Sequence, residues 1–445
     1  MKLTQNPKDS NTLTRRSLLM GAGGLSFLTI AACTQDAAES TNTDSGSLRF
    51  AWWGAAERQA LYREFLEHFQ AENPDIELSL EPADYTPYVD RLAVQAAGNN
   101  LPDLFWVPGS QFLTYAAEGT MFDLNELPAG AINFDDFEEG QVEGWQVLDG
   151  KQYSLVYNQI SPCIQINRDA MEQYGIDMAD DESWDWSDLG RMASEYSQAS
   201  EDGHFGMRYA AASQQHVELW LRQQGAELFD GDGAIGFDAA TLGDWFSMWE
   251  GWVEDGSVMP VPVAGAINTG YTEISDRIAI EPGAQSNHFA DNQAVTNGEL
   301  TMHFVPANSD ASSGYPYLWF NRICVPANVE NPELAAKFLD FFINDDRSID
   351  TIGVVSGPPS NPRLRALAQE KAVADDDVIA QKVLEISDRE AAREMRPRYE
   401  MPAGGSGWTT LLTRTAENIA VGGESISDAV QALIDELQRT VEDER

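Results

Sequence analysis

The sequence predicts an α/β fold in which helices flank a mainly parallel sheet. Three observations lead to this prediction: short apolar runs of strand length, segments of helical periodicity between them, and a regular alternation of the two from Ser47 onward. The length of 445 residues, of which 43% are hydrophobic, suffices for two or three domain-sized units, and no internal repeat is evident.

The first elements can be assigned from their periodicity. One helix has apolar residues at positions 61, 65, 66 and 69 and stops before Asn73-Pro74, and the strand after it alternates between apolar and polar residues. Further along, Asp185 or Ser187 can cap a helix that begins near Asp188. The predicted strands are 48–53, 76–80 and 104–107, and the predicted helices are 57–71, 85–97 and 112–118.

Residues 1–33 are predicted to be an export signal. Arg15 and Arg16 precede an apolar run of about fifteen residues, which is too short for a spanning helix but suits a signal sequence. The arginine pair resembles a twin-arginine signal, although Leu18 and Met20 depart from the usual pattern, so the general secretory route stays open. The run ends in Ile30-Ala31-Ala32-Cys33, which resembles a bacterial lipobox, so Cys33 is the predicted lipidation site.

The segment 34–47 is small and polar without apolar periodicity, which predicts a flexible tether. The mature protein would then be exported and held at the outer face of the cytoplasmic membrane by lipid on Cys33. A single acyl chain binds a membrane only marginally, so stable anchoring would need diacylation together with N-acylation.

The charge of the chain excludes several classes of partner. The formal net charge is −44, from 72 acidic and 28 basic side chains, and such a polyanion repels nucleic acid and anionic membrane surfaces. The acidic residues are spread along the whole chain, as expected of a solvated acidic surface.

Nothing in the sequence indicates a cofactor, a metal site or an enzyme. The three cysteines and five histidines have no metal-ligand spacing, and motifs of metalloproteases, serine hydrolases and phosphate-binding loops are absent. Asp230-Gly231-Asp232-Gly233 lacks the remaining ligands of a calcium loop, so a hairpin turn between 227–229 and 235–237 is predicted instead.

Several motifs occur in an order that is similar to family 1 extracellular solute-binding proteins of ABC importers, the maltose-type, carbohydrate-binding group. The first-lobe motifs are AWWG (51–54), ENPDIEL (72–78), LPDLFWV (101–107) and YAAEGTMFDLNEL (115–127). The stretch 150–176 resembles the crossing between lobes, and ESWDWSDL (182–189) a helix start in the second lobe. Later motifs are NPELAAKFLDFFIND (331–345), SGPPSNPRLRAL (356–367) and ENIAVGGESISDAVQALIDEL (417–437).

The resemblance covers essentially all of 47–440 and implies a two-lobed periplasmic-binding-protein type II fold with an interlobe ligand cleft and a hinge. Lobe one would comprise 47–157 plus 316–368, and lobe two 161–313 plus 372–445. The implied function is an extracytoplasmic lipoprotein that captures a mono- or oligosaccharide and delivers it to ABC permease subunits, as a monomer and without a cofactor of its own.

Sugar binding requires aromatic faces for the pyranose ring and polar side chains for its hydroxyls, placed where strands end. By strand alternation, one of Trp52 and Trp53 should face the core and the other the cleft. Trp106 fits the core and the cleft equally well. The candidate ligand-binding residues are Trp52, Trp53, Glu57, Trp106, Gln111, Asn158, Gln159, Gln214, His216, Glu281, Trp319 and Trp408, with Tyr317, Asn321, Arg398 and Tyr399 as further neighbours.

Family position supports part of this set. The loop that contains Gln111, the residues Gln214 and His216, the loop at Glu281 and the aromatic position of Trp408 correspond to places where the family contacts ligand. A single histidine is more often structural, so a core role for His216 stays open.

Cys163 and Cys324 fall just beyond the two crossing segments, which run side by side in this family. A disulfide that limits hinge motion is therefore one hypothesis, and two buried thiols acting as small hydrophobes are the other.

Two other functions compete with transport: a surface sensor or adhesin built on the same binding fold, and a secreted carbohydrate-active enzyme. Turnover of a bound glycan would identify the enzyme, and neighbouring permease genes would identify the transporter.

Overall fold

A computed structural model describes residues 45–145, 148, 150–307, 319–391 and 399–444. The predictions made for Arg15, Arg16, Cys33, Tyr317 and Arg398 lie outside this range. Within it, no helix combines the length and the apolar character needed to cross a bilayer.

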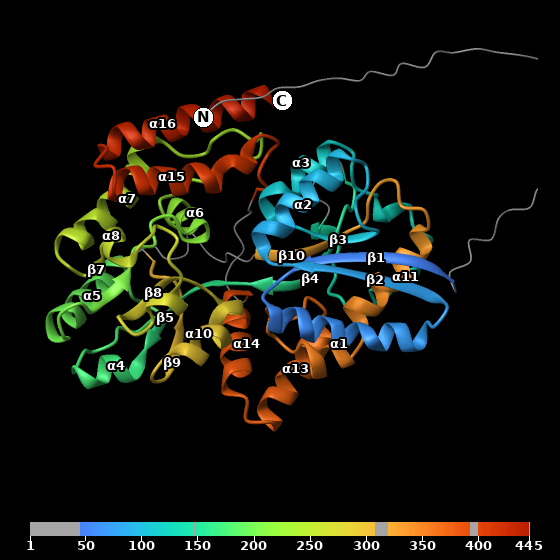
Figure 1. Ribbon diagram of the computed structural model, residues 1–445, viewed down its shortest axis with the longest axis horizontal. Helices are drawn as coiled ribbons and strands as arrows, with labels where there is room; N and C mark the ends of the chain where they lie inside the picture. The colour runs from blue at the N-terminus through green and yellow to red at the C-terminus, as the bar shows by residue number, and fades with distance from the viewer. Residues whose placement is uncertain (1–44, 146–147, 149, 308–318, 392–398, 445) are drawn as a thin grey trace, which may run out of the picture. The chain divides into compact units, whose positions relative to one another are not determined.

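The first sheet has the strand order β2-β1-β3-β10-β4 (Figure 1). β1 pairs in parallel with β2 and β3, whereas β10 is antiparallel to both β3 and β4. The strands are β1 (Gly46–Trp53), β2 (Ile76–Ala83), β3 (Leu104–Val107), β4 (Leu155–Ile160) and β10 (Trp319–Cys324), and helices α1 (Ala56–Glu72), α2 (Tyr85–Ala97) and α3 (Phe112–Ala117) alternate with them. These elements confirm the strand and helix assignments made for residues 48–118.

The second sheet has the order β7-β6-β8-β5-β9. Its strands are β5 (Pro162–Asn167), β6 (Phe205–Arg208), β7 (Val258–Met259), β8 (Ile278–Gln285) and β9 (Leu300–His303). β6 is parallel to β7 and β8, and β5 is antiparallel to β8 and β9. The expectation of mainly parallel pairing is thus wrong for half of the strand pairs. The antiparallel pairs involve β10 in one sheet and β5 in the other, strands that adjoin the crossings between sheets.

Each sheet carries its own apolar core, and we call the two assemblies lobe one and lobe two. In lobe one the first sheet packs with α1, α2, α3 and α11 (Pro332–Asn344). In lobe two the second sheet packs with helices that include α5 (Trp186–Ala199), α6 (Gln214–Gln223), α7 (Ala239–Glu254), α15 (Trp408–Ala420) and α16 (Ile426–Asp443). A third cluster joins α12 (Arg347–Thr351), α13 (Pro362–Ala374) and α14 (Val378–Ala391) to lobe-two residues such as Phe289 in α10 (Phe289–Val295).

Local capping explains two of these boundaries. The Asp185 side chain accepts a hydrogen bond from the Asp188 amide at 3.0 Å, and the Asp188 side chain accepts one from the Asp185 amide. The predicted cap of α5 is therefore confirmed, and it is a capping box. The predicted hairpin is also confirmed, because Phe229 and Ile235 form an antiparallel bridge around the Asp230 turn.

At the first crossing between the sheets a single residue, Ser161, stands between β4 and β5. The Ser161 amide donates to Ser286 Oγ at 3.1 Å, and the Ser286 amide donates to the Ser161 carbonyl at 2.9 Å. Asn158 lies beside this crossing, accepts from Asn321 Nδ2 at 2.7 Å and donates to the Ser356 carbonyl at 2.6 Å. These bonds tie the crossing to β10 and to the segment before α13.

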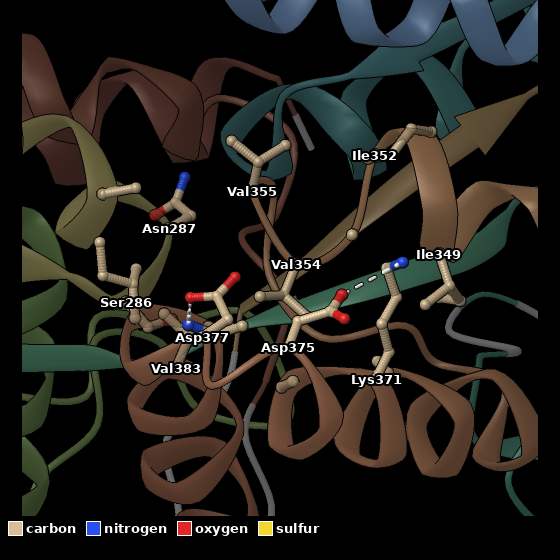
Figure 2. Close-up of a pocket in the computed structure, with 16 residues that line it drawn as sticks. Ser286, Asn287, Ile349, Ile352, Val354, Val355, Lys371, Asp375, Asp377 and Val383 are labelled. Carbon is tan, nitrogen blue, oxygen red and sulfur yellow. Dashed lines mark hydrogen bonds and ion pairs between the residues drawn. The ribbon is translucent and has the colours of Figure 1, made fainter.

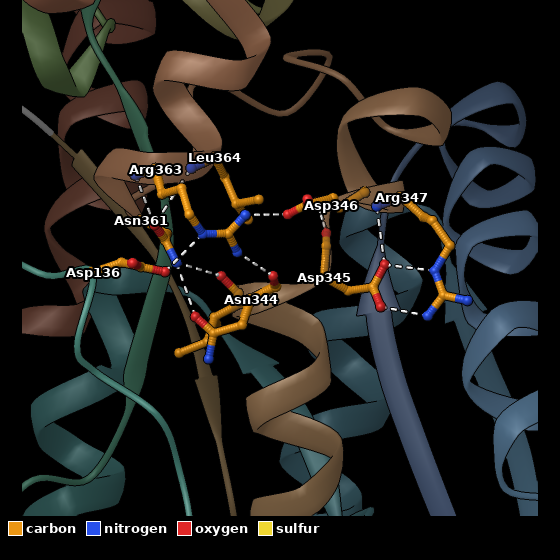
Figure 3. A network of polar contacts seen from close by, with 10 residues as sticks. Asp136, Asn344, Asp345, Asp346, Arg347, Asn361, Arg363 and Leu364 are labelled. Carbon is orange, nitrogen blue, oxygen red and sulfur yellow. Dashed lines mark hydrogen bonds and ion pairs between the residues drawn. The ribbon is translucent and has the colours of Figure 1, made fainter.

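A polar network fixes the start of α13 against lobe one (Figure 3). Asn361 caps the helix by accepting from the Arg363 amide at 2.9 Å. The Arg363 side chain forms ion pairs with Asp136 and Asp346 and donates to the Asn344 carbonyl at 2.6 Å. Exposed pairs of this kind add only about 0–1 kcal/mol each, so their role is to position the segment rather than to stabilise it strongly.

The hypothesis of a Cys163–Cys324 disulfide is not supported, because both residues are buried thiols in the structure. Cys163 lies in β5 opposite Ala284 of the second sheet, and Cys324 lies in β10 opposite Phe105 of the first. The crossings bring the two strands' ends together, but each cysteine is inside its own sheet.

Candidate ligand-binding cleft

A cavity of about 690 Å³ is lined by residues of both lobes. Its size falls in the range of about 300–1,000 Å³ that small-molecule sites occupy. The lining comes from the ends of β1, β3 and β8, from the start of β10, and from the first turns of α1, α2, α6 and α15. Strand ends and helix N-termini therefore meet at one place. In open α/β sheets, ligands bind beyond the carboxyl ends of the strands, and this cavity has that position.

The lobe-one wall is aromatic. Trp53 is half-buried, and its ring lies 5.6 Å from Tyr85 and 5.1 Å from Trp106, both in edge-on arrangements. Trp319 at the start of β10 packs against Gly109, where an added Cβ would lie 2.9 Å from the indole. Together with Phe320, these rings offer apolar faces on which the C–H face of a sugar can stack.

The lobe-two wall consists almost entirely of amides and hydroxyls: Ser213, Gln214, Gln215, Gln285, Asn287 and Thr409. Thr409 Oγ1 donates to Gln214 Oε1 at 2.6 Å, and Gln214 Nε2 donates to Glu218 at 3.0 Å, so this amide is held in place from two sides. Asn287 is 8% exposed, and its Oδ1 has no hydrogen-bond partner within the described chain. Such a buried acceptor suits a ligand hydroxyl.

Charged groups face the cavity from both lobes: Arg58 and Asp84 from lobe one, and His288 and Asp291 from lobe two. His288 is open to the cavity but surrounded by protein atoms, and desolvation lowers its pKa. The positive charge of Arg58 lowers the His288 pKa further, whereas the Asp291 carboxylate raises it.

Four of the predicted residues line the cavity: Trp53, Trp106, Gln214 and Trp319. The neighbour Asn321 lines it as well. Trp106 is only 1% exposed and stacks on Tyr157 at 4.9 Å, so it belongs both to the core and to the cavity wall. Its indole Nε1 has no acceptor among the described residues.

Two predicted tryptophans are in the core instead. Trp52 is fully buried and stacks on Phe50 at 5.0 Å, because residues two apart in a strand share a face. Trp408 is also fully buried, packed 5.8 Å from Phe237 in lobe two, so its expected place in the cleft is wrong. The first turn of α15 presents Thr409 and not Trp408 to the cavity.

Three predicted polar residues are buried with protein partners. Asn158 makes the crossing contacts described above. His216 contacts Ser213 Oγ at 2.8 Å and the Cys163 carbonyl at 3.3 Å, and burial lowers its pKa to about 4. Asn158 and His216 therefore connect neighbouring segments behind the cavity wall, and neither side chain lines the cavity.

Glu281, the third, is 2% exposed and forms two hydrogen bonds of 2.6 Å with Arg208. The family resemblance predicts a loop at Glu281, but β8 continues to Gln285 past a bulge opposite Cys163 and Gln165. Glu281 is therefore inside the sheet. A Cβ at Gly283 would lie 2.6 Å from the Arg208 guanidinium, so the glycine makes room for this pair.

Three other predicted residues lie close to the cavity but do not line it. Glu57 is exposed in the first turn of α1, Gln111 is half-buried after β3, and Gln159 is half-buried in β4. Tyr399 is exposed and contacts Gly231 away from the cleft.

Sequence reasoning missed Arg58, Tyr85, Asn287 and His288. A search for residues after strand ends would have found Asn287 and His288 had β8 been assigned its full length. Arg58 lies one position after the predicted Glu57 in the first turn of α1, and Tyr85 is the first residue of α2, the helix that follows β2.

A second cavity lies between α10 and helices α12, α13 and α14 (Figure 2). Its volume is about 200 Å³, below the usual range for small-molecule sites. Its lining is mainly aliphatic, and its polar members are Ser286, Asn287, Asp377 and the Lys371–Asp375 pair at 3.4 Å. The larger cleft is the better candidate. In the described residues no cluster of three or more His, Cys, Asp or Glu side chains could hold a metal.

A two-lobed α/β fold with a cleft between the lobes defines the class of extracytoplasmic solute-binding proteins. Residues 64–380 match the family model of bacterial extracellular solute-binding proteins, and the chain belongs to that family. It is a solute-binding protein of the kind that serves ABC importers.

Characterised relatives are similar at low identity. A maltooligosaccharide ABC transporter solute-binding lipoprotein of Streptococcus pneumoniae serotype 4 is 22% identical over 379 residues, covering 81% of this chain and 84% of that protein. An arabinooligosaccharide-binding protein of Bacillus subtilis is 23% identical over 326 residues, covering 71% and 72%.

A solved structure shows the same fold: a periplasmic oligogalacturonide-binding protein of Yersinia enterocolitica, in complex with saturated digalacturonic acid. It superposes with a TM-score of 0.77 over 89% of this chain and 99% of the other, at 14% identity. These relatives are binding proteins and not enzymes.

Proposed function

We propose that this protein captures an oligosaccharide outside the cytoplasm and delivers it to the permease subunits of an ABC importer. The observation that carries the proposal is the composition of the cleft, in which Trp53, Trp319 and Phe320 face a wall of amides and hydroxyls. Aromatic faces and hydrogen-bonding groups on opposite sides suit a pyranose, which has apolar C–H faces and polar edges.

The mechanism is a clamp. A sugar that contacts both walls binds more tightly when the lobes are close, so binding shifts the population toward the closed form. The closed form then docks on the permease, and the separate ATPase of the importer supplies the energy. No covalent step or cofactor is needed.

Thermal melting of the purified full chain with a panel of oligosaccharides, polyols and amino acids tests the proposal. A true ligand at 100 times its Kd should stabilise the protein by about 2.7 kcal/mol, which raises Tm by a few degrees. The sugar should be recovered unchanged. Shifts with amino acids alone would overturn the sugar assignment, and hydrolysis of the sugar would favour an enzyme.

Export and anchoring form a second part of the proposal. Processing before Cys33 and lipidation of its thiol would hold a monomeric binding protein at the membrane, with Arg15 and Arg16 directing export. Mass spectrometry of the mature N-terminus should find a diacylglyceryl group on Cys33, and Cys33→Ser should release the protein into the medium. An unmodified cysteine in the exported protein would contradict this.

We also propose the lobe boundaries 47–157 plus 316–368 and 161–313 plus 372–445. Hydrogen exchange should then show a ligand-induced slowing at the cleft faces of both ranges.

A further inference from the structure

Arg58 is a cation that lines the cleft and has no hydrogen-bond or ion-pair partner among the described residues. It lies in the first turn of α1, and its side chain folds back over Gly54, where an added Cβ would lie 2.9 Å from Arg58 Cδ. Because Gly54 has no side chain, the methylene groups of Arg58 can lie against it along the cavity wall. Arg58 lines the cavity together with Trp53, and its positive charge lowers the pKa of His288, a lining residue of lobe two.

No described residue forms a hydrogen bond or ion pair with Arg58, and its Nε is buried without an acceptor. Other arginines of low exposure are paired: Arg208 with Glu281, Arg222 with Glu227, and Arg322 with Glu400. The chain has 72 acidic and 28 basic side chains, so a lack of carboxylates does not explain why Arg58 has no ion-pair partner among the described residues. A partly desolvated cation left unpaired suits an anion that arrives with the ligand.

Helix N-termini add positive potential at the same place. The caps of α1, α2, α6 and α15 make no side-chain hydrogen bond to the first helical amides. At α6, Ser213 contacts His216 instead. Five long helices whose N-termini do not line the cleft are capped by side chains: α5, α7, α11, α13 and α16. Uncapped N-termini leave amide donors and partial positive charge available to an acceptor.

Two buried polar groups in the lining are also unpartnered. In the part of the chain that the structure describes, Trp106 Nε1 has no acceptor, and Oδ1 of Asn287, an amide 8% exposed, has no donor. The donor belongs to the wall that carries Arg58, and the acceptor to the opposite wall. The lobe-one wall can therefore donate a further hydrogen bond to an anionic acceptor, and the lobe-two wall can accept one from a hydroxyl.

Asp84 and Asp291 also face the cleft and limit the charge of the ligand. Both are exposed, and the Asp291 carboxylate raises the pKa of His288, which burial and Arg58 lower. Carboxylates accept hydrogen bonds from sugar hydroxyls but repel a ligand dense in negative charge. The combination favours a polyol with isolated carboxylates over a phosphate or sulfate ester.

From this juxtaposition we infer that the ligand is an acidic oligosaccharide containing hexuronic acid, whose carboxylate pairs with Arg58 at the lobe-one wall. The inference rests on the proposed function and specifies its substrate class. The guanidinium fork would bind the carboxylate in a bidentate manner, and Trp53 would stack on the adjoining ring face.

Isothermal titration calorimetry on the full chain tests this with three ligands: digalacturonate, its dimethyl ester and maltose. The ester keeps every ring hydroxyl and removes the negative charges, and it adds one methyl group to each carboxyl. We expect digalacturonate to bind at least tenfold more tightly than either neutral sugar. Arg58→Gln should weaken digalacturonate binding by about 10- to 100-fold and leave the ester within about twofold.

Arg63→Gln is the matched control, since Arg63 is an exposed residue of the same helix outside the cleft, and it should leave all affinities unchanged. Arg58→Lys should retain part of the preference, and melting without ligand checks that each variant folds. If Arg58→Gln does not fold, the comparison of acid with ester on the unsubstituted protein decides.

Tight binding of maltose or of the ester with no preference for the acid would overturn the acidic-ligand inference and leave the proposed function intact. An unchanged digalacturonate affinity in Arg58→Gln would also overturn it. Binding of none of the three sugars, together with no melting shift from any sugar in the panel, would overturn both.

Discussion

The two walls of the cleft divide the work of binding. The Trp, Tyr and Phe rings among the described lining residues all come from lobe one, whereas lobe two contributes amides, hydroxyls, the His288 imidazole and the Asp291 carboxylate. The difference is not one of composition, because lobe two is rich in tryptophan, including Trp186, Trp245, Trp249 and Trp408. Lobe two uses its rings to build a core, and lobe one turns some of its rings toward the ligand.

This contrast suggests that lobe one recognises the faces of a sugar and lobe two recognises its edges. Edge contacts depend on hydroxyl positions, so discrimination among sugars of equal charge should lie mainly in lobe two. Affinity should lie mainly in lobe one, where stacking area is largest.

The largest expected effect is on stability, and it distinguishes a tryptophan of the core from a tryptophan of the cleft. Trp408→Ala should lower the free energy of unfolding by about 3–5 kcal/mol, because it removes a fully buried ring from lobe two. Trp53→Ala should cost less, since Trp53 is already half-buried. Urea denaturation of both variants measures this. A Trp408→Ala variant of normal stability that no longer binds sugar would reverse the assignment of the two rings.

The second effect concerns the support behind the lobe-two wall. The folded-state pKa of His216 is about 4, below the ordinary 6.5, so the unfolded chain takes up its proton first as the pH falls. The stability due to neutral His216 is complete above about pH 6.5 and is lost toward pH 4, with about 2 kcal/mol lost between pH 7 and pH 5.

His216→Gln should lose less stability than the unsubstituted protein over that interval. The difference between the two pH profiles is the relevant quantity, because the many carboxylates contribute equally to both. Parallel profiles would mean that His216 is not held neutral by the fold.

A third prediction addresses affinity at the lobe-one wall. Trp53→Ala should weaken binding of the sugar that gives the largest melting shift by about 10- to 100-fold, whereas Trp53→Phe, which keeps a ring, should lose less than about tenfold. Calorimetry with each variant provides the measurement. Equal losses for the two substitutions would show that stacking does not dominate.

The smallest effect should come from the lobe-two wall. Thr409→Val removes the hydroxyl that fixes Gln214 and should weaken binding about threefold to tenfold, with a change in preference among sugars. Thr410→Val is the control, because Thr410 is exposed on the same helix and does not line the cavity. If Thr409→Val weakened all sugars equally, the proposed division between faces and edges would fail.

Much of the fold could be predicted from the sequence, because periodicity and turn residues are local signals. The elements between residues 48 and 118 are examples, and the alternation of Trp52 and Trp53 correctly placed one ring in the core and the other on the cavity. What failed depended on contacts distant in sequence.

Glu281 illustrates that limit. Glu281-Pro282-Gly283 has the composition of a turn, but β8 runs through it because Arg208 neutralises the carboxylate and a bulge in the pairing accommodates the proline. No pattern in the sequence around Glu281 indicates that Arg208, more than seventy residues away, will lie beside it. The same reason hid Asn287 and His288, whose position depends on where β8 ends.

Trp408 illustrates a second limit. A ring at the start of a helix can point to either side, and a rotation of one residue exchanges Trp408 for Thr409 at the cavity. Only the packing of α15 against Phe237 and its neighbours decides which one faces the ligand.

The passage through Ser161 has a mechanical consequence. At this crossing one residue stands between the two sheets, hydrogen-bonded to Ser286 through its amide and its carbonyl, so few backbone torsions are available there to absorb a relative movement of the lobes. If the lobes pivot about this crossing, the gap beside it changes in width less than the outer mouth does. We then expect the inner end of the cleft to select the thickness of a ligand, and the mouth to tolerate differences in its length.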